Sequence, residues 1–302
     1  YFDIDWQPPT PGLANRVLLP VLGEQFGAEL EGGKLSIAFE AEADRATFAV
    51  AYYDKRWPVA PRTWQRILDL ALEVLALPKD DPTYHEVQSI RTALSHIPLP
   101  SETAPERREE RAREKEVIKR RLGEVCTRST EVRAAIEAAL AAKNPSGPGD
   151  VGAIEWLDTI LGDQNYRLAY WRVATEEVNY RRFFDINELA AIRMEDPRVF
   201  EATHALVLGL VESGAVTGLR LDHTDGLYEP QAYFKLLQER LRLARKVTHG
   251  DTYVLAEKIL EHGEILPRRG PIAGTTGYDL LAVINGQRVD ANPMEEAQAI
   301  DD

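Results

Sequence analysis

Hydrophobic and polar positions divide the chain into three segments with different periodicities. Residues 1–60 carry short apolar runs separated by polar or proline-rich stretches. Residues 61–165 carry apolar side chains at helical spacing, and residues 166–302 alternate helical patterns with short apolar runs. We therefore expect a loop-rich β subdomain, then a large helical insertion, and then a return segment built of α/β units.

Local patterns predict the elements of the first two segments. Three apolar runs predict strands, and Pro20 makes the first of them an edge strand or two short pieces: 17–23, 34–39 and 47–53. Helical spacing predicts five helices: 64–77, 83–97, 106–121, 129–142 and 151–161. Thr83 and Glu86 have the spacing of a capping box, so we expect Thr83 to begin the second helix. Charges of both signs interleave in the third helix, which is typical of a solvated helix.

Two short apolar runs in the last segment each end on a carboxylate. The run 215–221 leads into Asp222, and the run 252–256 leads into Glu257. Helical patterns beginning at Pro197 and Pro230 precede these runs. Because strands that alternate with helices pair in parallel, the fold class is α/β, and both carboxylates are expected at one edge of a sheet.

Composition narrows the classes of function. The 302 residues carry a formal net charge of −13, which disfavours nucleic acid and anionic membrane surfaces as partners. No apolar run reaches the length of a membrane span. The single cysteine, Cys126, excludes an internal disulfide and is consistent with a reducing compartment, so we expect a cytoplasmic protein. The six histidines lack metal-ligand spacing and no nucleotide-binding fingerprint occurs, so no cofactor and no metal is expected.

The strand-end residues favour acid–base chemistry on a glycosidic bond. Residues two apart on a strand share a face, so Arg220 lies beside Asp222 and favours its ionised form. Glu257 follows an apolar run, so partial burial is expected to raise its pKa. An ionised aspartate and a protonated glutamate about 5–5.5 Å apart are the pair used by retaining glycosidases. Taken alone, Asp222 remains equally readable as a helix cap or a surface acid.

The same residues resemble the α-amylase superfamily of glycoside hydrolases, family 13. The nucleophile-strand motif of that family is similar to residues 218–223, and its acid-strand motif is similar to residues 255–257. Further segments resemble one branch of the family that carries out intramolecular transglucosylation: 1–6, 17–23, 179–185 and 274–279. The resemblance implies the central part of a (β/α)8 TIM barrel, with the β subdomain inserted after an early barrel strand.

The resemblance also implies roles for individual residues. Asp222 would be the nucleophile, Glu257 the acid/base, and Arg220 the partner of the nucleophile. The remaining residues would contact the sugars or form a neighbouring wall: His223, Lys258, Tyr278, Asp279, Tyr180 and Arg181. The reaction would convert the reducing-end α-1,4 linkage of a maltooligosaccharide into an α,α-1,1 linkage, a step of trehalose biosynthesis.

Departures from the family pattern keep alternatives open. An Asn-His motif of an early strand and a third catalytic carboxylate of a late strand are absent from the 302 residues. The chain is therefore expected to be an incomplete, largely inactive catalytic fragment that can associate through exposed sheet edges. The residues after Asp222 also differ from the common amylase pattern. Another α-glucan hydrolase or transglycosylase, or a non-catalytic glycan-binding module, remains an alternative.

Overall fold

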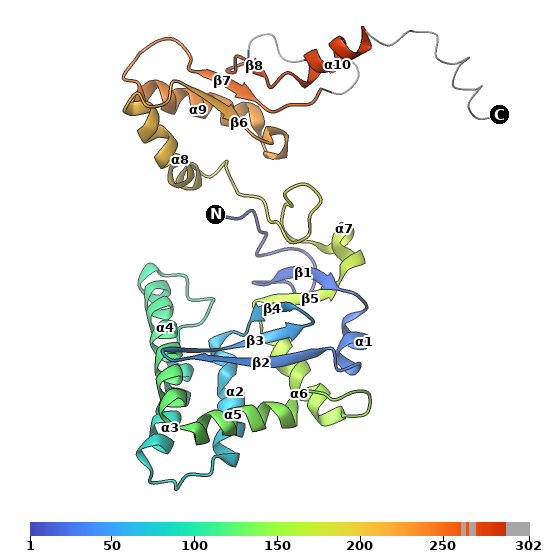
Figure 1. Cartoon of the computed structure of the whole chain (residues 1–302), viewed down its shortest axis with the longest axis vertical. Coiled ribbons are helices and arrows are strands. Elements are labelled where there is room, and N and C mark those ends of the chain that lie inside the picture. The colour runs from blue at the N-terminus through green and yellow to red at the C-terminus, as the bar shows by residue number, and fades with distance from the viewer. Residues whose placement is uncertain (261–263, 266–269, 288–302) are drawn as a thin grey trace, which may run out of the picture. The chain divides into compact units, whose positions relative to one another are not determined.

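The computed structural model describes residues 1–260, 264–265 and 270–287, which form two compact units (Figure 1). The larger unit comprises Ile4–Arg181 with Ile186–Glu188. The smaller unit comprises Tyr1–Asp3, Arg182–Asp185 and the chain from Leu189 onward. The last residues of the predicted third segment, 288–302, lie outside the described residues.

Two small sheets lie in the larger unit. The first is antiparallel, in the order β2 (Leu35–Glu42), β3 (Arg45–Tyr52) and β4 (Lys55–Pro58). The second pairs β1 (Val17–Leu22) with β5 (Tyr166–Tyr170) in parallel, and its register shifts between Pro20 and Leu22. The three predicted strands are confirmed, and Pro20 lies at the irregularity because proline removes a ladder donor. β4 was missed, since its four residues carry no apolar run.

Helices make up the rest of the larger unit, and no strand interrupts the described residues between β4 and β5. Their bounds are α1 (Phe26–Glu31), α2 (Trp64–Val74), α3 (Pro82–His96), α4 (Pro105–Arg128), α5 (Thr130–Lys143), α6 (Val151–Gly162) and the short α7 (Ala174–Glu177). The prediction of a long helical stretch between two strand-bearing segments is therefore confirmed. Cys126 lies buried inside α4 rather than between helices.

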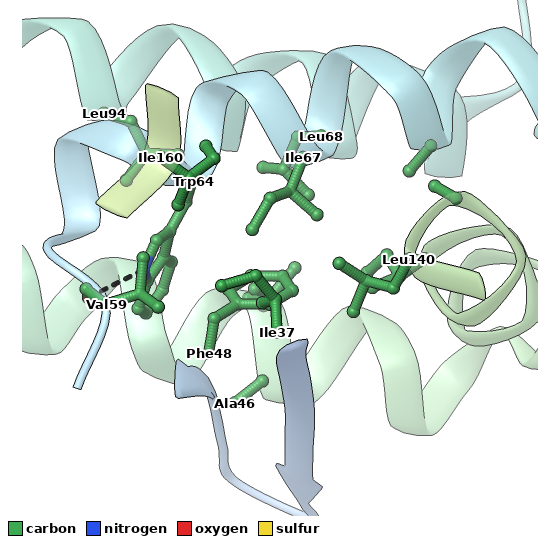
Figure 2. Close-up of a cluster of buried hydrophobic side chains, with 14 of the residues drawn as sticks. Ile37, Ala46, Phe48, Val59, Trp64, Ile67, Leu68, Leu94, Leu140 and Ile160 are labelled. Carbon is green, nitrogen blue, oxygen red and sulfur yellow. Dashed lines mark hydrogen bonds between the residues drawn. The ribbon is translucent and has the colours of Figure 1, made fainter. Parts of the chain in front are cut away.

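One hydrophobic core joins the antiparallel sheet to these helices (Figure 2). Phe48 on β3 packs edge-to-face on Trp64 of α2, with ring centroids 5.1 Å apart. The indole N–H of Trp64 donates a 3.0 Å hydrogen bond to the carbonyl of Val59, so the largest core side chain leaves no unpaired polar group. Ile67 of α2 and Leu140 of α5 close the same cluster from the helical side.

The capping prediction for α3 was wrong. Asp81 is the N-cap, and its carboxylate accepts a hydrogen bond of 2.6 Å from the backbone N–H of Thr83. Pro82 occupies the first helical position, which suits proline because that N–H has no partner in a helix. Glu86 is therefore free of the cap and lies 3.1 Å from Arg121 on α4, where it ties the two helices together.

The smaller unit alternates helices and parallel strands. Its described elements are α8 (Pro197–Glu212), β6 (Gly218–Leu221), α9 (Pro230–Ala244), β7 (Tyr253–Ala256), β8 (Gly274–Thr275) and α10 (Tyr278–Gly286). The strands form one parallel sheet in the order β6, β7, β8. Phe200 and Val211 of α8 and Leu237 and Leu241 of α9 pack on the sheet residue Val254. The predicted parallel α/β pattern is confirmed.

The described strands of the smaller unit do not close a barrel. The fold that the structure shows is thus mixed α/β, with one antiparallel sheet, one parallel pair and one parallel three-stranded sheet. None of the helices in the described ranges combines the length and the apolar character needed to cross a bilayer.

Candidate active site

The register of β6 and β7 brings Asp222 and Glu257 together. Leu221 pairs with Ala256 at the carboxyl end of the sheet, so the next residue of each strand is a carboxylate. The backbone N–H of Glu257 donates a 2.7 Å hydrogen bond to the carbonyl of Leu221, which continues the ladder to this point. The two predicted catalytic carboxylates therefore emerge side by side from neighbouring parallel strands.

Arg220 lies between the two carboxylates. One of its terminal nitrogens is 3.5 Å from Oδ1 of Asp222 and 3.7 Å from Oε1 of Glu257. Oδ1 of Asp222 and Oε1 of Glu257 can therefore be no farther apart than the sum of these two distances. Asp222 and Glu257 also interact directly, and a hydrogen bond between their carboxyl groups is the largest cause of the raised pKa of Asp222.

The two carboxylates differ in exposure and in the donors around them. The side chain of Asp222 is 74% exposed, whereas that of Glu257 is 24% exposed. Oε2 of Glu257 accepts a 3.0 Å hydrogen bond from the backbone N–H of His223, and Oε1 accepts one of 3.4 Å from the hydroxyl of Tyr278. Thr224 donates from its hydroxyl to the backbone carbonyl of Glu257 at 3.2 Å. Glu257 is therefore fixed by hydrogen bonds at both carboxylate oxygens and at its backbone carbonyl.

The pKa of each carboxyl group of the pair is shifted in the direction opposite to the one expected from sequence. The hydrogen bond with Glu257 and the negative charge of Glu257 raise the pKa of Asp222, and Arg220 only partly offsets them. The hydrogen bond with Asp222 and the backbone N–H of His223 lower the pKa of Glu257, assisted by Arg220 and Tyr278. The expectation was wrong because sequence does not show which carboxylate receives the neighbouring donors.

His223 adopts a backbone conformation that few side chains favour. Its φ is 47°, in the left-handed region. Its ring stacks on Phe184 with centroids 3.7 Å apart and meets Phe183 edge-on at 4.6 Å. Gly226 lies against the same ring, since a Cβ built there would be 2.5 Å from Nε2 of His223. The predicted site residue His223 is thus locked beside Asp222 by its neighbours.

Three further side chains contribute to the site. Phe183 and Phe184 lie in the loop 179–185, which the sequence predicts as a neighbouring wall, whereas Thr224 was not predicted. The aromatic pair could have been identified as the only Phe-Phe dipeptide in the chain, directly beside a predicted site segment. Nothing in the sequence singles out Thr224.

The other predicted site residues are placed as follows. Lys258 lies 3.1 Å from Asp225 and 2.9 Å from Glu264, and thereby ties together the loops that follow β6 and β7. Asp279 accepts a 2.8 Å hydrogen bond from the hydroxyl of Thr275 and lies in the first turn of α10. Neither side chain has a contact with the two carboxylates among the interactions of the described residues.

Tyr180 and Arg181 belong to the larger unit, whereas the two carboxylates belong to the smaller one. Tyr180 is buried, and its hydroxyl donates to the backbone carbonyl of Asn187. Their role as sugar contacts stays a prediction. His262, one of the six histidines, lies outside the described residues. Within the described part of the chain, no cluster of three or more histidine, cysteine or acidic side chains could hold a metal ion.

The parallel strand ends, the paired carboxylates and the bridging arginine have the features of a retaining glycoside-bond-processing enzyme. No protein-family model matches the chain. Over 127 residues it is 42% identical to the putative maltooligosyl trehalose synthase of Mycobacterium tuberculosis, present in strains H37Rv and CDC 1551. Those residues are 42% of this chain and 15% of that protein.

Solved structures agree with this sequence match. A maltooligosyltrehalose synthase from Arthrobacter ramosus superimposes with a TM-score of 0.51 and 27% identity, over 98% of this chain and 24% of that one. A structure described as DSM5389 glycosyltrehalose synthase shares the fold, with a TM-score of 0.50 and 23% identity over 98% of this chain and 27% of that one. The chain is homologous to maltooligosyltrehalose synthase. The match covers 15% of the Mycobacterium protein and about a quarter of each of the two solved structures.

Proposed function

We propose that this chain carries the catalytic strands of an intramolecular transglucosylase of the α-amylase superfamily. The reaction converts the reducing-end α-1,4 linkage of a maltooligosaccharide into an α,α-1,1 linkage and leaves a terminal trehalose unit. The observation that carries this proposal is the register of β6 and β7, which sets Asp222 opposite Glu257 with Arg220 beside both. The homology to maltooligosyltrehalose synthase selects the reaction within the class.

The proposed reaction proceeds by two displacements. A carboxylate oxygen of Asp222 attacks the anomeric carbon of the penultimate glucose, while Glu257 protonates the departing oxygen of the reducing-end glucose. A glycosyl ester on Asp222 and a free glucose result. That glucose then turns and attacks the same carbon through its own anomeric hydroxyl, whose proton passes to Glu257 as the ester bond breaks. The number of bonds and protons is unchanged, so the product is an isomer of the substrate.

The proposal requires the carboxyl pair to open when the sugar binds. A glycosidic oxygen between Asp222 and Glu257 breaks their mutual hydrogen bond, and this removes the largest cause that lowers the pKa of Glu257. The proton is then free to settle on Glu257, while Arg220 remains beside Asp222 and supports its charge. Substrate binding therefore restores the protonation order that the reaction needs.

Further residues are proposed as contacts of the sugars. His223 and Tyr278 adjoin the carboxylate pair, and Lys258, Asp279, Tyr180 and Arg181 are proposed for more distant positions around the cleaved bond. In the same proposal, the smaller unit supplies successive strands of a (β/α)8 barrel, and residues 1–60 and 61–165 are the inserted β subdomain and helical insertion. The enzyme needs a water-poor pocket, because water would otherwise compete with the freed glucose.

The test uses the full-length enzyme that contains this sequence, with maltopentaose as substrate and chromatography of the products. Asp222→Asn and Glu257→Gln are each expected to lower the rate of non-reducing product formation by at least about 10³-fold. Asp225→Asn serves as the matched control, because it changes a nearby carboxylate whose ion pair among the described residues is with Lys258. Full activity of Asp222→Asn would contradict the proposal.

A hydrolytic relative is the second candidate, and the exposure of Asp222 favours it. A side chain that is 74% exposed leaves a glycosyl ester open to water. Release of glucose and shortened maltooligosaccharides, without any product that resists reducing-sugar reagents, would select the hydrolase over the transglucosylase.

A further inference from the structure

A cationic cavity lies in the larger unit, on residues that play no part in the proposed catalytic site. Its volume is about 1120 Å³, and it is lined by residues from the start of α2, the loop that joins α3 to α4, and the first half of α4. Five of its lining residues are basic: Arg62, Arg66, Arg108, Arg111 and Lys115. Three are acidic: Asp69, Asp163 and Glu109.

Ion pairs within the protein remove part of this charge. Arg66 pairs with Asp163 at 3.0 Å, and Asp69 pairs in a bidentate manner with Arg91, at 2.7 Å and 3.1 Å. Lys115 also lies 3.6 Å from Glu116, which does not line the cavity. Arg62, Arg108 and Arg111 are then the basic lining residues without an ion pair among the described residues, against the one acidic residue Glu109. The cavity is therefore locally cationic in a chain whose formal net charge is −13.

Two of the remaining arginines are held in place by the backbone of the connecting loop. Arg62 donates one terminal N–H to the carbonyl of Ile97 at 2.6 Å. Arg111 donates one to the carbonyls of Leu99 and Glu102, at 2.6 Å and 3.3 Å. In each case one nitrogen is used for anchoring, and the other N–H groups of the guanidinium have no protein partner among the described residues. A planar fork fixed in this way is suited to phosphate oxygens.

The walls of the cavity exclude one obvious ligand. Prolines and aliphatic residues form the apolar part, and no aromatic side chain occurs among the described residues that line it. A glucan chain would find no flat ring face here on which to pack. Arg62, Arg111 and Lys115 are half-buried, so their charges are only partly screened by water and attract an anion more strongly than surface charges would.

We propose that this cavity binds a small phosphate-bearing molecule, with the phosphate between Arg62 and Arg111 and with Arg108 and Lys115 as further cationic contacts. The site is separate from the carboxylate pair and does not depend on the proposed transglucosylation. A double substitution of Asp222 and Glu257 is accordingly expected to leave binding unchanged, whatever the outcome of the activity test.

Calorimetric titration of the 302-residue protein with inorganic pyrophosphate tests this site. Saturable binding is expected, and Arg111→Gln is expected to weaken it by about 10-fold or more. Because Arg111 also anchors the loop, Arg108→Gln provides a second variant. The side chain of Arg108 makes no hydrogen bond or ion pair with the described residues, so its replacement leaves the loop in place. Arg120→Gln is the control, since Arg120 lies on the same helix but lines a different hollow. It is expected to bind pyrophosphate as the unchanged protein does.

Four results would overturn the proposal. Pyrophosphate that does not bind at millimolar concentration would contradict it, as would equal affinity in the Arg111→Gln and Arg108→Gln variants and the unchanged protein. Neutral maltotriose that binds instead of pyrophosphate, with an affinity that neither variant weakens, would show that the site does not recognise charge. A glutamate-rich peptide that binds where pyrophosphate does not would indicate a protein partner instead.

Discussion

The backbone N–H of His223 donates a 3.0 Å hydrogen bond to Oε2 of Glu257. His223 directly follows Asp222, so the loop that carries one carboxylate also positions the other. The hydrogen bond favours the charged form of Glu257 and is one of the causes that lower its pKa. The two carboxyl groups therefore act as one unit rather than as two independent acids.

The first prediction concerns that unit. Glu257→Gln removes both the hydrogen bond and the charge that raise the pKa of Asp222, so the pKa of Asp222 is expected to fall toward its ordinary value. Arg220→Gln removes the opposing cation, so it is expected to raise the pKa of Asp222 further. Carboxyl-carbon NMR titration of the protein measures both shifts. Shifts of the same sign in the two variants would contradict the electrostatic account.

Acid sensitivity is predicted for the N-cap of α8. Asp196 accepts hydrogen bonds from the side chain and backbone N–H of Arg198, which lower its pKa to about 2. Its ordinary value is about 3.9, so its stabilising contribution is present above that pH and is lost as the pH falls toward 2. Asp196→Asn keeps a capping side chain but removes the charge.

The Asp196→Asn variant is accordingly expected to have a lower melting temperature than the unchanged protein at pH 7. The difference should shrink as the pH falls from about 4 toward 2, because both proteins are then uncharged at this position. Thermal unfolding followed by circular dichroism across this range measures the effect. A difference that stays constant with pH would show that the charge of Asp196 contributes nothing.

Two helical glycines should respond in opposite ways to alanine. A Cβ on Gly123 of α4 would lie 2.4 Å from the backbone nitrogen of Arg45 at the start of β3, so Gly123→Ala is expected to destabilise by about 1–3 kcal/mol. Gly209 of α8 has nothing within 4 Å of its Cβ position. Gly209→Ala is therefore expected to stabilise by about 0.5–1 kcal/mol through helix propensity. Urea unfolding of the two variants measures the change in the free energy of unfolding. Stabilisation by Gly123→Ala would contradict the close contact with Arg45.

A buried hydrogen bond between α8 and α9 gives the fourth prediction. Nε2 of His204 lies 2.9 Å from the hydroxyl of Tyr233, and Nδ1 lies 2.9 Å from the carbonyl of Phe200. Tyr233→Phe leaves one ring nitrogen without a partner, at an expected cost of about 1–3 kcal/mol. Tyr228→Phe, at a side chain that is 67% exposed, serves as the control and is expected to change little. Equal unfolding midpoints for the two variants would contradict this role of Tyr233.

Local periodicity predicted much of the fold. The helices α2 to α6, α8 and α9, the strands β1 to β3, and the parallel neighbours β6 and β7 follow from apolar spacing and from proline positions, because burial of one face imposes the period on the sequence. The short helices α1 and α7 were not predicted. The strand β4 and the cap of α3 were not predicted correctly. Four residues without an apolar run form β4 because they pair with β3, and Asp81 rather than Thr83 reaches the free N–H groups of α3.

The chain's residue order was sufficient to select Asp222, Glu257 and Arg220, since charged residues that follow short apolar runs mark strand ends in a parallel sheet. Tertiary contacts alone decided how those residues are charged and held. The approach of the His223 backbone, the ring of Phe184 against His223 and the hydroxyl of Tyr278 come from segments far apart or from loop geometry. The pKa of a carboxylate depends on the donors that surround it in space, and apolar periodicity carries no information about those donors.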